Sequence, residues 1–267
     1  MVPNRFRTTA ALLLAAAVAV PASADEPVRI RVLSYNIHHG RGTDDVVDLD
    51  RIARVINDER PDVIALQEVD RGVERSGRID EPAELARLTG TRAVFERNIS
   101  YQGGDYGNAL LTRLPIEASR NVPLPSSYEG EQRGCLVVDL EAPGGQGSIR
   151  VLATHLDYRP PDEERLASAA RIAEIAAEHP DRPTILMGDL NARPDSAVLL
   201  RFDEDWTRAN AEPMPTFPAV EPTRQIDYIL VRPEARWRVV EIRVLEEEVA
   251  SDHRPIFAEL ELIVGEG

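Results

Sequence analysis

The chain has 267 residues, of which 31 are basic and 46 acidic, so its formal charge is −15 at pH 7. Every basic residue is an arginine, which excludes chemistry that needs a lysine amine, such as a Schiff base or a P-loop lysine. The hydrophobic fraction of 43% is typical of a globular domain, and a single cysteine excludes an intramolecular disulfide and cysteine-rich metal sites.

The first 24 residues have the pattern of a secretory signal peptide. Two arginines precede an apolar run at residues 10–20, and Ala22-Ser23-Ala24 ends it with small residues. The run is short for a bilayer span, so an uncleaved anchor is the less favoured alternative. We expect cleavage to release residues 25–267 as one domain, exported to the periplasm or the medium, monomeric and without stable membrane insertion.

The rest of the chain alternates apolar, β-rich runs with three stretches of helical period. Asp48 is a candidate cap for the first helix, which Pro61 stops, and Gly90 closes the second. The third helix follows Asp162 and ends before Pro180. The predicted strands are Val28–Ile37, Asp62–Val69, Ala109–Ile116, Cys135–Leu140, Ile149–His155, Thr184–Leu190, Ile226–Val231, Trp237–Leu245 and Pro255–Val264, and helical periodicity runs over Leu49–Ile56, Ala83–Leu88 and Leu166–Ala176.

One long segment, residues 203–224, has neither a helical nor a strand period. It contains four prolines together with Trp206 and Phe217. A structureless stretch of this length inside a compact domain is usually functional or mobile. We therefore expect an irregular loop here rather than a further regular element.

Polar side chains gather at the ends of six predicted strands. An unpaired charge is costly to bury, so carboxylates at the edges of apolar strands indicate a shared cation. The strings are Ser34-Tyr35-Asn36, Leu66-Gln67-Glu68-Val69, Thr154-His155-Leu156, Gly188-Asp189-Leu190-Asn191, Gln225-Ile226-Asp227-Tyr228 and Ser251-Asp252-His253-Arg254-Pro255.

Taken singly, each of these residues has an ordinary structural explanation. Glu68 could be a solvated acid at a strand end, and Asp189 could belong to a turn. His155 could be a hydrogen-bonded core histidine, and Asp252 could cap a turn. Asp227 could pair with a neighbouring arginine. Only the six strings together, in their order along the chain, are specific enough to indicate a function.

In that order, the strings resemble the endonuclease/exonuclease/phosphatase superfamily, which includes DNase I-like nucleases, abasic-site endonucleases, neutral sphingomyelinases and inositol-polyphosphate 5-phosphatases. The resemblance extends from about Arg31 to Leu262, and Tyr106-Gly107-Asn108-Ala109-Leu110 also fits the family's middle strand. It implies an α/β fold, a four-layer sandwich in which two mixed β-sheets pack face to face with helices outside.

The resemblance also implies a metal site and phosphate contacts. Glu68 would be the metal carboxylate, with Asn36 and Asp252 close to the same ion. Oxygen ligands suit Mg²⁺, with Mn²⁺ or Ca²⁺ as alternatives. Asn108 would lie beside the phosphate. Arg133 could reach a phosphate oxygen, although an ordinary surface arginine explains it equally well.

Acid–base roles are implied for two further groups. His253, held in one tautomer by Asp227, is the leading candidate to activate water, and Asp189, steered by Asn191, is the second acid–base candidate. The sequence does not decide which of them does which. His155 and Asn191 would donate hydrogen bonds to phosphate oxygens.

The sequence thus predicts an exported, divalent-metal-dependent hydrolase of phosphoric esters, a phosphodiesterase or phosphatase that uses in-line attack of water. A secreted DNase I-like nuclease is the alternative, disfavoured because a strongly negative chain repels polyanions and lacks a basic run. A non-catalytic binding module ranks lower, because every expected catalytic position is filled. The sequence does not decide whether the substrate is a small phosphodiester, a lipid headgroup or a nucleic acid.

Overall fold

The computed structural model describes residues 27–128 and 130–263, so the predicted signal peptide lies outside the described residues. The described chain contains four α-helices and twelve strands. The helices are α1 (Leu49–Glu59), α2 (Glu81–Thr89), α3 (Glu163–Ala177) and α4 (Ala197–Asp203). The strands are β1 (Val28–Asn36), β2 (Val63–Arg71), β3 (Arg92–Tyr101), β4 (Gly104–Thr112), β5 (Ile116–Pro123), β6 (Gly134–Glu141), β7 (Ser148–His155), β8 (Thr184–Asp189), β9 (Thr207–Arg208), β10 (Asp227–Arg232), β11 (Trp237–Val244) and β12 (Ile256–Leu262).

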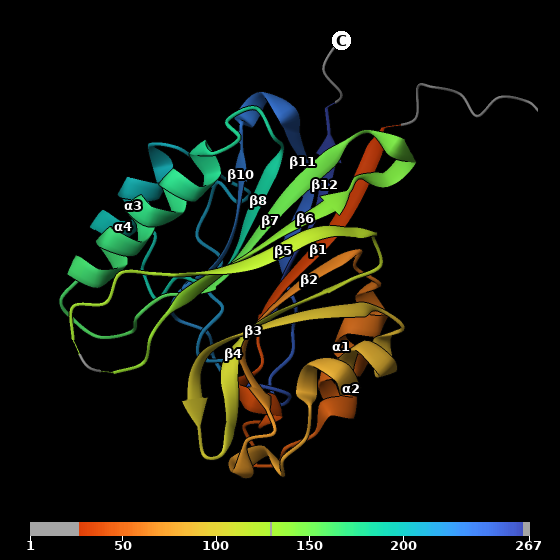
Figure 1. Ribbon diagram of the computed structural model, residues 1–267, viewed down its shortest axis with the longest axis vertical. Helices are drawn as coiled ribbons and strands as arrows, with labels where there is room; N and C mark the ends of the chain where they lie inside the picture. The colour runs from red at the N-terminus through yellow and green to blue at the C-terminus, as the bar shows by residue number, and fades with distance from the viewer. Residues whose placement is uncertain (1–26, 129, 264–267) are drawn as a thin grey trace, which may run out of the picture.

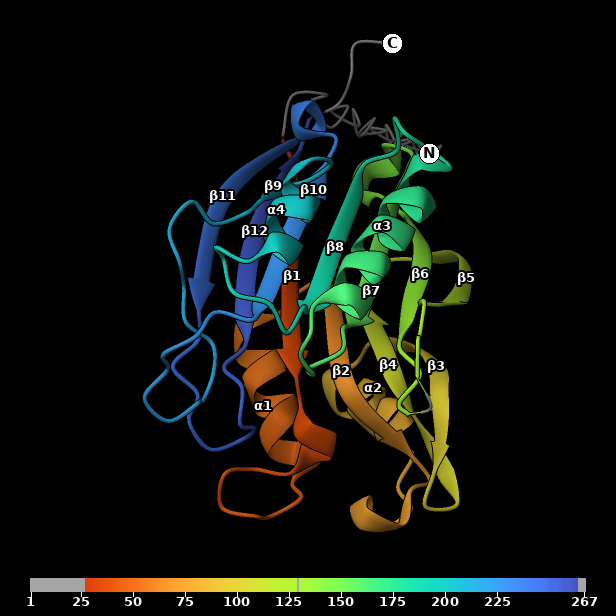
Figure 2. The same cartoon turned by 90° about the vertical axis from the view of Figure 1, so that its left-hand side faces the viewer.

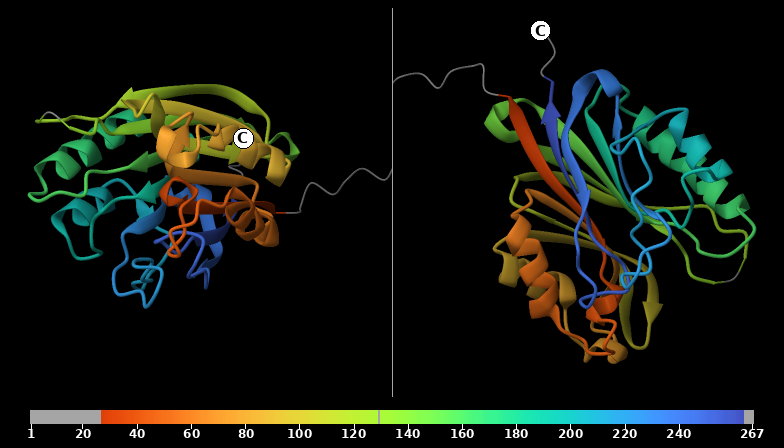
Figure 3. Two further views of the ribbon diagram at one scale, coloured as in Figure 1. Left: turned by 90° about the horizontal axis from the view of Figure 1, so that it is seen from below. Right: turned by 180° about the vertical axis from the view of Figure 1, so that it is seen from behind.

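The strands form two mixed sheets of six strands each. The first has the order β11-β12-β1-β2-β4-β3 and the second the order β5-β6-β7-β8-β10-β9. Helices α1 and α2 lie on one flank of the molecule and α3 and α4 on the opposite flank (Figures 1 and 2). Views from below and from behind show the same separation (Figure 3). The predicted four-layer sandwich is therefore confirmed.

Three apolar layers hold the four structural layers together. Between the sheets, Ile30 and Val32 of β1 belong to the same buried cluster as Val151 of β7. On the other face of β1, Leu33 packs in a second cluster with Ile52 of α1. Successive side chains of a strand point to opposite faces, so a strand buried on both sides reads as a nearly continuous apolar run.

Helix ends follow the local sequence signals. Asp48 caps α1 by accepting a hydrogen bond from the Arg51 amide at 2.9 Å, and Arg60 ends that helix in the left-handed conformation just before Pro61. Gly90 ends α2 with a φ of 64°. Helix α3 begins directly after Asp162. The three predicted helices are present and Asp48 is confirmed as a cap, whereas the side chain of Asp162 makes no capping hydrogen bond.

Five observed elements differ from the prediction. Strands β3 and β5, the short strand β9 and helix α4 were not predicted, and the predicted strand Ala109–Ile116 is wrong at its end. The chain turns at residues 113–115, so Ile116 begins β5 rather than ending β4. β3 and β5 are edge strands of their sheets and are largely exposed, so they lack the apolar signal of buried strands.

The sheet registers bring the polar strand ends together. β1 runs parallel to β2, and β7 runs parallel to β8, so the carboxyl ends of each pair lie at one edge. His155 pairs with Asp189 in register, and Asp189 pairs with Asp227 of the antiparallel strand β10. These three residues therefore lie in one row across the second sheet. β1 also contacts β8 across the sandwich, which places Asn36 near the row.

A buried carboxyl group lies where α2 meets β2. Glu81 is inaccessible to solvent, and its Oε2 accepts a hydrogen bond from the Asp70 amide at 2.8 Å. Burial raises the pKa of Glu81 to about 8, against the effect of this hydrogen bond. The carboxylate of Asp70 is likewise buried and is paired with Arg75 through two contacts, at 2.8 and 2.9 Å.

The raised pKa of Glu81 should make stability depend on pH. Between about pH 4.5 and about pH 8 the unfolded chain loses this proton while the folded chain keeps it, so the contribution of Glu81 to stability falls as pH rises. We expect Glu81→Gln to raise the Tm above that of the wild type at about pH 9, by on the order of 5 °C, and to change it little at about pH 4. Calorimetry across this pH range measures the difference.

Glu84→Gln is the matched control, because Glu84 lies on the same helix, is partly exposed and pairs with Arg87 at 2.6 Å. Its Tm should show no gain over the wild type that grows with pH. A Tm difference for Glu81→Gln that stays constant from about pH 4 to about pH 9 would contradict the burial of an uncharged carboxyl group here.

Candidate active site

A cavity of about 520 Å³ opens where the polar strand ends meet. Most of the residues predicted for the site line it, and arginine and aromatic side chains complete its wall. The predicted residues in the wall are Glu68, Arg133, His155, Asp189, Asn191, Asp252 and His253. The others include Arg75, Tyr101, Tyr106, Glu131, Tyr158, Phe217 and Arg224. Thus the topology brings side chains from both sheets to one concave surface.

His253 is held against the cavity by Asp227. Its Nδ1 lies 2.9 Å from Oδ2 of Asp227, and the same oxygen accepts a hydrogen bond from the Thr216 hydroxyl at 2.5 Å. The ring centroid lies 4.8 Å from that of Phe217. Because Nδ1 is engaged with a carboxylate, the geometry favours the Nδ1–H tautomer and leaves Nε2 free, 3.7 Å from Oδ2 of Asp189.

The charge state of His253 follows from opposing effects. Burial lowers its pKa, but the carboxylate of Asp227 and, more weakly, those of Asp189 and Asp252 outweigh burial and raise the pKa to about 10. These three aspartates therefore stabilise the imidazolium form when no other cation is near. Two of them, Asp189 and Asp227, are themselves almost completely buried.

Asp189 is the most connected carboxylate of the cavity. Its Oδ1 accepts a hydrogen bond from the backbone N–H of Asn191 at 2.8 Å, and its Oδ2 accepts one from Nδ2 of Asn36 at 3.2 Å. Burial, followed by the charge of Asp227, raises the pKa of Asp189 to about 7. A carboxyl group whose pKa lies near neutrality is suited to general acid–base catalysis.

Gly188 explains the Gly-Asp string before this carboxylate. A Cβ atom at this position would lie 2.0 Å from the carbonyl oxygen of Thr154 on the neighbouring strand. Only glycine lets β7 and β8 approach this closely at their ends. The close approach places His155 and Asp189 side by side, with 3.4 Å between Nε2 and Oδ2.

His155 and Asn191 form a neutral polar pair. The two side chains are 3.0 Å apart, Nε2 to Nδ2, and Asn191 also donates a hydrogen bond to the carbonyl oxygen of Leu156 at 3.0 Å. Burial holds the pKa of His155 well below its usual value, so the ring is uncharged. Its Nδ1 has no partner among the described residues. Both residues face the cavity, as hydrogen-bond partners of a bound phosphate would.

Glu68 enters the cavity from a distorted part of β2. The register with β4 shifts between Leu66 and Val69, and Glu68 has a φ of 59°. A left-handed conformation at a non-glycine residue costs about 1–3 kcal/mol and is concentrated at functional sites. β-Bulges re-aim side chains in the same way. Here the bulge turns the Glu68 carboxylate out of the sheet, where Oε1 accepts a hydrogen bond from Nδ2 of Asn36 at 3.0 Å.

The donor set around Glu68 fits a hard divalent cation. Carboxylates of Glu68 and Asp252 face the cavity, and the amide of Asn36 lies behind them. Ser251 ties this group together, because its hydroxyl donates to the carbonyl oxygen of Asn36 at 2.7 Å and lies 3.4 Å from Oδ1 of Asp252. Few carboxylates and an open cavity match an ion that retains several waters.

Two other predicted residues occupy different positions. Arg133 lines the cavity but is buried and paired with Glu131 at 2.7 Å, so it is not an ordinary surface arginine. Asn108 lies behind the wall and donates a hydrogen bond to the carbonyl oxygen of Gly134 at 3.1 Å. Its amide therefore supports the start of β6 in this structure.

Sequence reasoning missed the aromatic and arginine part of the wall. Arg75 packs over the rings of Tyr101 and Tyr106, with 4.8 and 5.3 Å from Cζ to the ring centroids. Arg224 packs over Phe217 at 4.7 Å. Tyr101 ends the unpredicted strand β3, and Tyr106 belongs to the part of β4 that precedes the predicted strand. The Tyr106-Gly107-Asn108 string was the available signal for that strand.

Comparisons with known proteins show which family the chain belongs to. The chain is 30% identical over 247 residues to the Escherichia coli protein YbhP, with 87% of this chain and 96% of YbhP covered. It is 24% identical over 195 residues to a 5′-tyrosyl-DNA phosphodiesterase of Caenorhabditis elegans, with 68% of this chain and 49% of that protein covered.

A solved structure shares both fold and sequence. An endonuclease/exonuclease/phosphatase from Beutenbergia cavernae superposes with a TM-score of 0.72 at 29% identity, and the match covers 88% of this chain and 72% of that one. The model of the Endonuclease/Exonuclease/phosphatase family matches residues 33–253, a range that contains every predicted site residue. The chain therefore belongs to the endonuclease/exonuclease/phosphatase family of phosphoric-ester hydrolases.

Proposed function

We propose that this hydrolase is an exported phosphodiesterase or phosphatase that acts on a compact phosphoric ester with the help of a divalent cation. Mg²⁺ is the first candidate ion, and Mn²⁺ and Ca²⁺ are alternatives. One observation carries the proposal. Two acid–base candidates, His253 and Asp189, two phosphate-facing groups, His155 and Asn191, and the carboxylate of Glu68 line one cavity.

Glu68 and Asp252 would hold the cation, with Asn36 beside them. Bound there, a divalent cation supplies positive charge that polarises the phosphate and stabilises the leaving oxygen. The uncharged His155 and Asn191 would donate hydrogen bonds to phosphate oxygens as negative charge develops on them. No covalent link between the protein and the phosphate is needed.

His253 and Asp189 would move the protons. His253 presents Nε2 to the cavity and would take a proton from the attacking water, while Asp227 holds its Nδ1–H. Because the pKa of His253 is about 10, its ring is protonated at neutral pH. The negative field of the aspartates must be offset, by a bound cation or by a proton on Asp189, before Nε2 can accept a proton. Asp189, with a pKa of about 7, would protonate the leaving oxygen.

The wall of the cavity supports a compact substrate over a nucleic acid. Arg75 and Arg133 are paired with the acids Asp70 and Glu131, so they add little positive potential for a polyanion. The formal charge of −15 opposes long-range attraction of DNA. The aromatic rings of the wall suit an apolar or aromatic group on the ester. The C. elegans relative named above keeps a DNA-linked phosphodiester as the second candidate substrate.

The first test of this proposal is a hydrolysis panel. Protein purified with Mg²⁺ should hydrolyse bis-p-nitrophenyl phosphate faster than it degrades duplex DNA, single-stranded DNA or RNA. Sphingomyelin and an inositol polyphosphate complete the panel. EDTA should abolish all hydrolysis, and Mg²⁺ or Mn²⁺ should restore it, because the phosphate needs the cation's charge. Full activity in EDTA, or a preference for duplex DNA, would contradict the proposal.

Glu68→Gln adds a variant arm to this test. Its Mg²⁺ affinity should fall by on the order of 10–100-fold or more, since even partners of metal ligands contribute that much. Its Tm without metal should equal or exceed that of the wild type, because the change removes one negative charge from an acidic cluster. Glu117→Gln, at an exposed position of β5, is the control and should change neither quantity.

The second prediction concerns the pair formed by His253 and Asp227. His253→Ala should lower kcat by a factor on the order of 10²–10⁴, the usual range for general acid–base catalysis. Asp227→Asn should lower kcat by a smaller factor, because the imidazole stays in place and only its tautomer and orientation are less well fixed. The double variant should be little worse than His253→Ala, since groups that act as a unit have non-additive effects. Steady-state kinetics at saturating metal measure all four rates.

Melting temperatures of the same four proteins separate catalysis from folding. His179→Ala, which removes an exposed histidine after α3, should leave kcat unchanged. Rate losses that multiply in the double variant, or near-wild-type kcat in His253→Ala, would remove this pair from the mechanism. Asp189 would then be the sole acid–base candidate.

The third prediction concerns export. When the full-length gene is expressed in a bacterial host, N-terminal sequencing of the periplasmic or secreted protein should begin at Asp25, because small residues precede this position. Ala24→Arg should block cleavage and leave the precursor. Protein with an intact Met1 in the membrane fraction of wild-type cells would refute export by this route. No helix among the described residues is long and apolar enough to cross a bilayer.

A further inference from the structure

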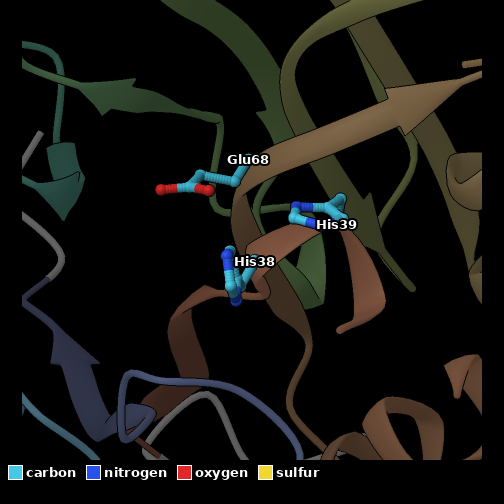
Figure 4. A group of neighbouring side chains, drawn as sticks. All are labelled: His38, His39 and Glu68. Atoms are coloured by element: carbon cyan, nitrogen blue, oxygen red, sulfur yellow. The ribbon is translucent and has the colours of Figure 1, made fainter. Parts of the chain in front are cut away.

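Two consecutive histidines lie against Glu68 outside the set of residues used above. His38 and His39 belong to the short turn His38–Gly40 that follows β1. One ring nitrogen of His38, one of His39 and one carboxylate oxygen of Glu68 all lie within 4.8 Å of one another. Figure 4 shows these three side chains close to one another, the two histidines on the turn and Glu68 on β2. Neither histidine lines the cavity described above.

The two histidines have polar atoms that the protein itself does not satisfy. Nδ1 of His38 and Nδ1 of His39 are buried and have no hydrogen-bond partner among the described residues. His39 as a whole is only 5% exposed. The two rings pack edge to face, with 4.5 Å between their centroids. Buried polar groups without partners are rare, and binding an ion is one way to satisfy them.

The backbone is strained at all three positions. His38 and His39 each have a φ of 46°, and Glu68 has a φ of 59°. Non-glycine residues adopt this left-handed conformation seldom, and they keep it only where the surroundings impose it. The strain places three potential ligands around one point, although none of them forms a hydrogen bond there with either of the others.

We propose that His38, His39 and Glu68 bind a transition-metal ion of the Zn²⁺ class, at a site separate from the oxygen-liganded cation beside Asp252. Imidazole nitrogen prefers Zn²⁺, Co²⁺ or Ni²⁺ to Mg²⁺, and two histidines with one glutamate form a known Zn²⁺ ligand set with an open position. Oδ1 of Asp252, assigned above to the hard cation, lies 3.8 Å from Nδ1 of His38, so the two sites adjoin.

The local geometry allows the ligands to close on an ion. Zn²⁺ needs nitrogen and oxygen atoms at about 2.0–2.2 Å, so the three groups must approach one another slightly. The side chains of His38 and Glu68 are partly exposed, which leaves them room to rotate. Arg75, whose charge acts on His39, is paired with Asp70, so its repulsion of a cation is reduced.

The site shares Glu68 with the proposed hard-cation site and rests on the proposed function only through that residue. A carboxylate between two cations divides its negative charge between them. Occupancy of the histidine site should therefore weaken binding of Mg²⁺ at the neighbouring site. The enzyme would thus respond to two classes of ion, one bound by nitrogen and one by oxygen alone.

Cobalt(II) binding to tag-free, full-length protein without substrate tests the site. Co²⁺ reports nitrogen ligation through its visible absorption, and isothermal titration gives the stoichiometry. We expect the protein to bind one equivalent of Co²⁺ that excess Mg²⁺ does not displace. Zn²⁺ should displace it. His38→Gln, at the partly exposed position, should weaken this equivalent by more than the roughly 10–100-fold typical for loss of a metal ligand's partner. His38→Gln/His39→Gln should abolish it.

Two further histidine variants serve as controls. His179→Gln should retain the Mg²⁺-resistant equivalent, because this histidine is exposed and remote. His253→Gln tests the other possible cluster, formed by Asp189, Asp227 and His253, whose ligand atoms also lie within 4.8 Å of one another. We expect His253→Gln to retain the equivalent as well. Circular dichroism confirms that each variant is folded, and His38→Gln alone suffices if the double variant unfolds.

Three results would overturn the proposal. They are the absence of a Mg²⁺-resistant equivalent in the wild type, its undiminished presence in His38→Gln, and its loss in His253→Gln but not in His38→Gln. The outcome is separable from that of the proposed function. Binding is measured without substrate, so a protein that binds Zn²⁺ through His38 but hydrolyses no phosphoric ester would refute only the function. A protein that hydrolyses phosphoric esters but binds no Mg²⁺-resistant equivalent of Co²⁺ would refute only the site.

Discussion

The burial of two aspartates side by side is the constraint on which the arrangement of polar strand ends around the cavity depends. Asp189 and Asp227 are partners in the register of β8 and β10, and they are 2% and 1% exposed. Adjacent buried carboxylates cannot both carry a full charge without compensation. His253 supplies it, with Nδ1 2.9 Å from Asp227 and Nε2 3.7 Å from Asp189. The displaced pKa values of His253 and Asp189 result directly from this packing.

Local distortions of the strands complete the arrangement. Gly188 lets β7 and β8 meet closely, and the bulge at Glu68 turns a carboxylate out of a strand that is otherwise buried on both faces. The two layers of helices and the apolar layer between the sheets hold these distorted ends in place. The packed sandwich around them can therefore maintain strained residues such as Glu68 and His39.

The sequence carried more information on buried strands than on exposed ones. β1, β7 and β8 were predictable because their residues are apolar on both faces, and the polar strings at their ends marked Asn36 and Asp189. β3 and β5 were not, because they are exposed edge strands. Because β3 was not predicted, Tyr101 at its end was not among the predicted site residues. No local pattern could show that Glu81 would be buried, since the packing of α2 on β2 brings its carboxyl group to the Asp70 amide.

The most direct measurement of the central claim is a crystal structure with Mn²⁺ and a non-hydrolysable phosphate-ester analogue, with the ion located by anomalous scattering. We expect the Mn²⁺ peak at about 2.1–2.2 Å from the Glu68 carboxylate, near Asp252, and the phosphorus within hydrogen-bonding reach of His155 and His253. Mn²⁺ bound instead among Asp189, Asp227 and His253, or a phosphate outside the cavity, would contradict the assignment of acid–base and metal-binding roles.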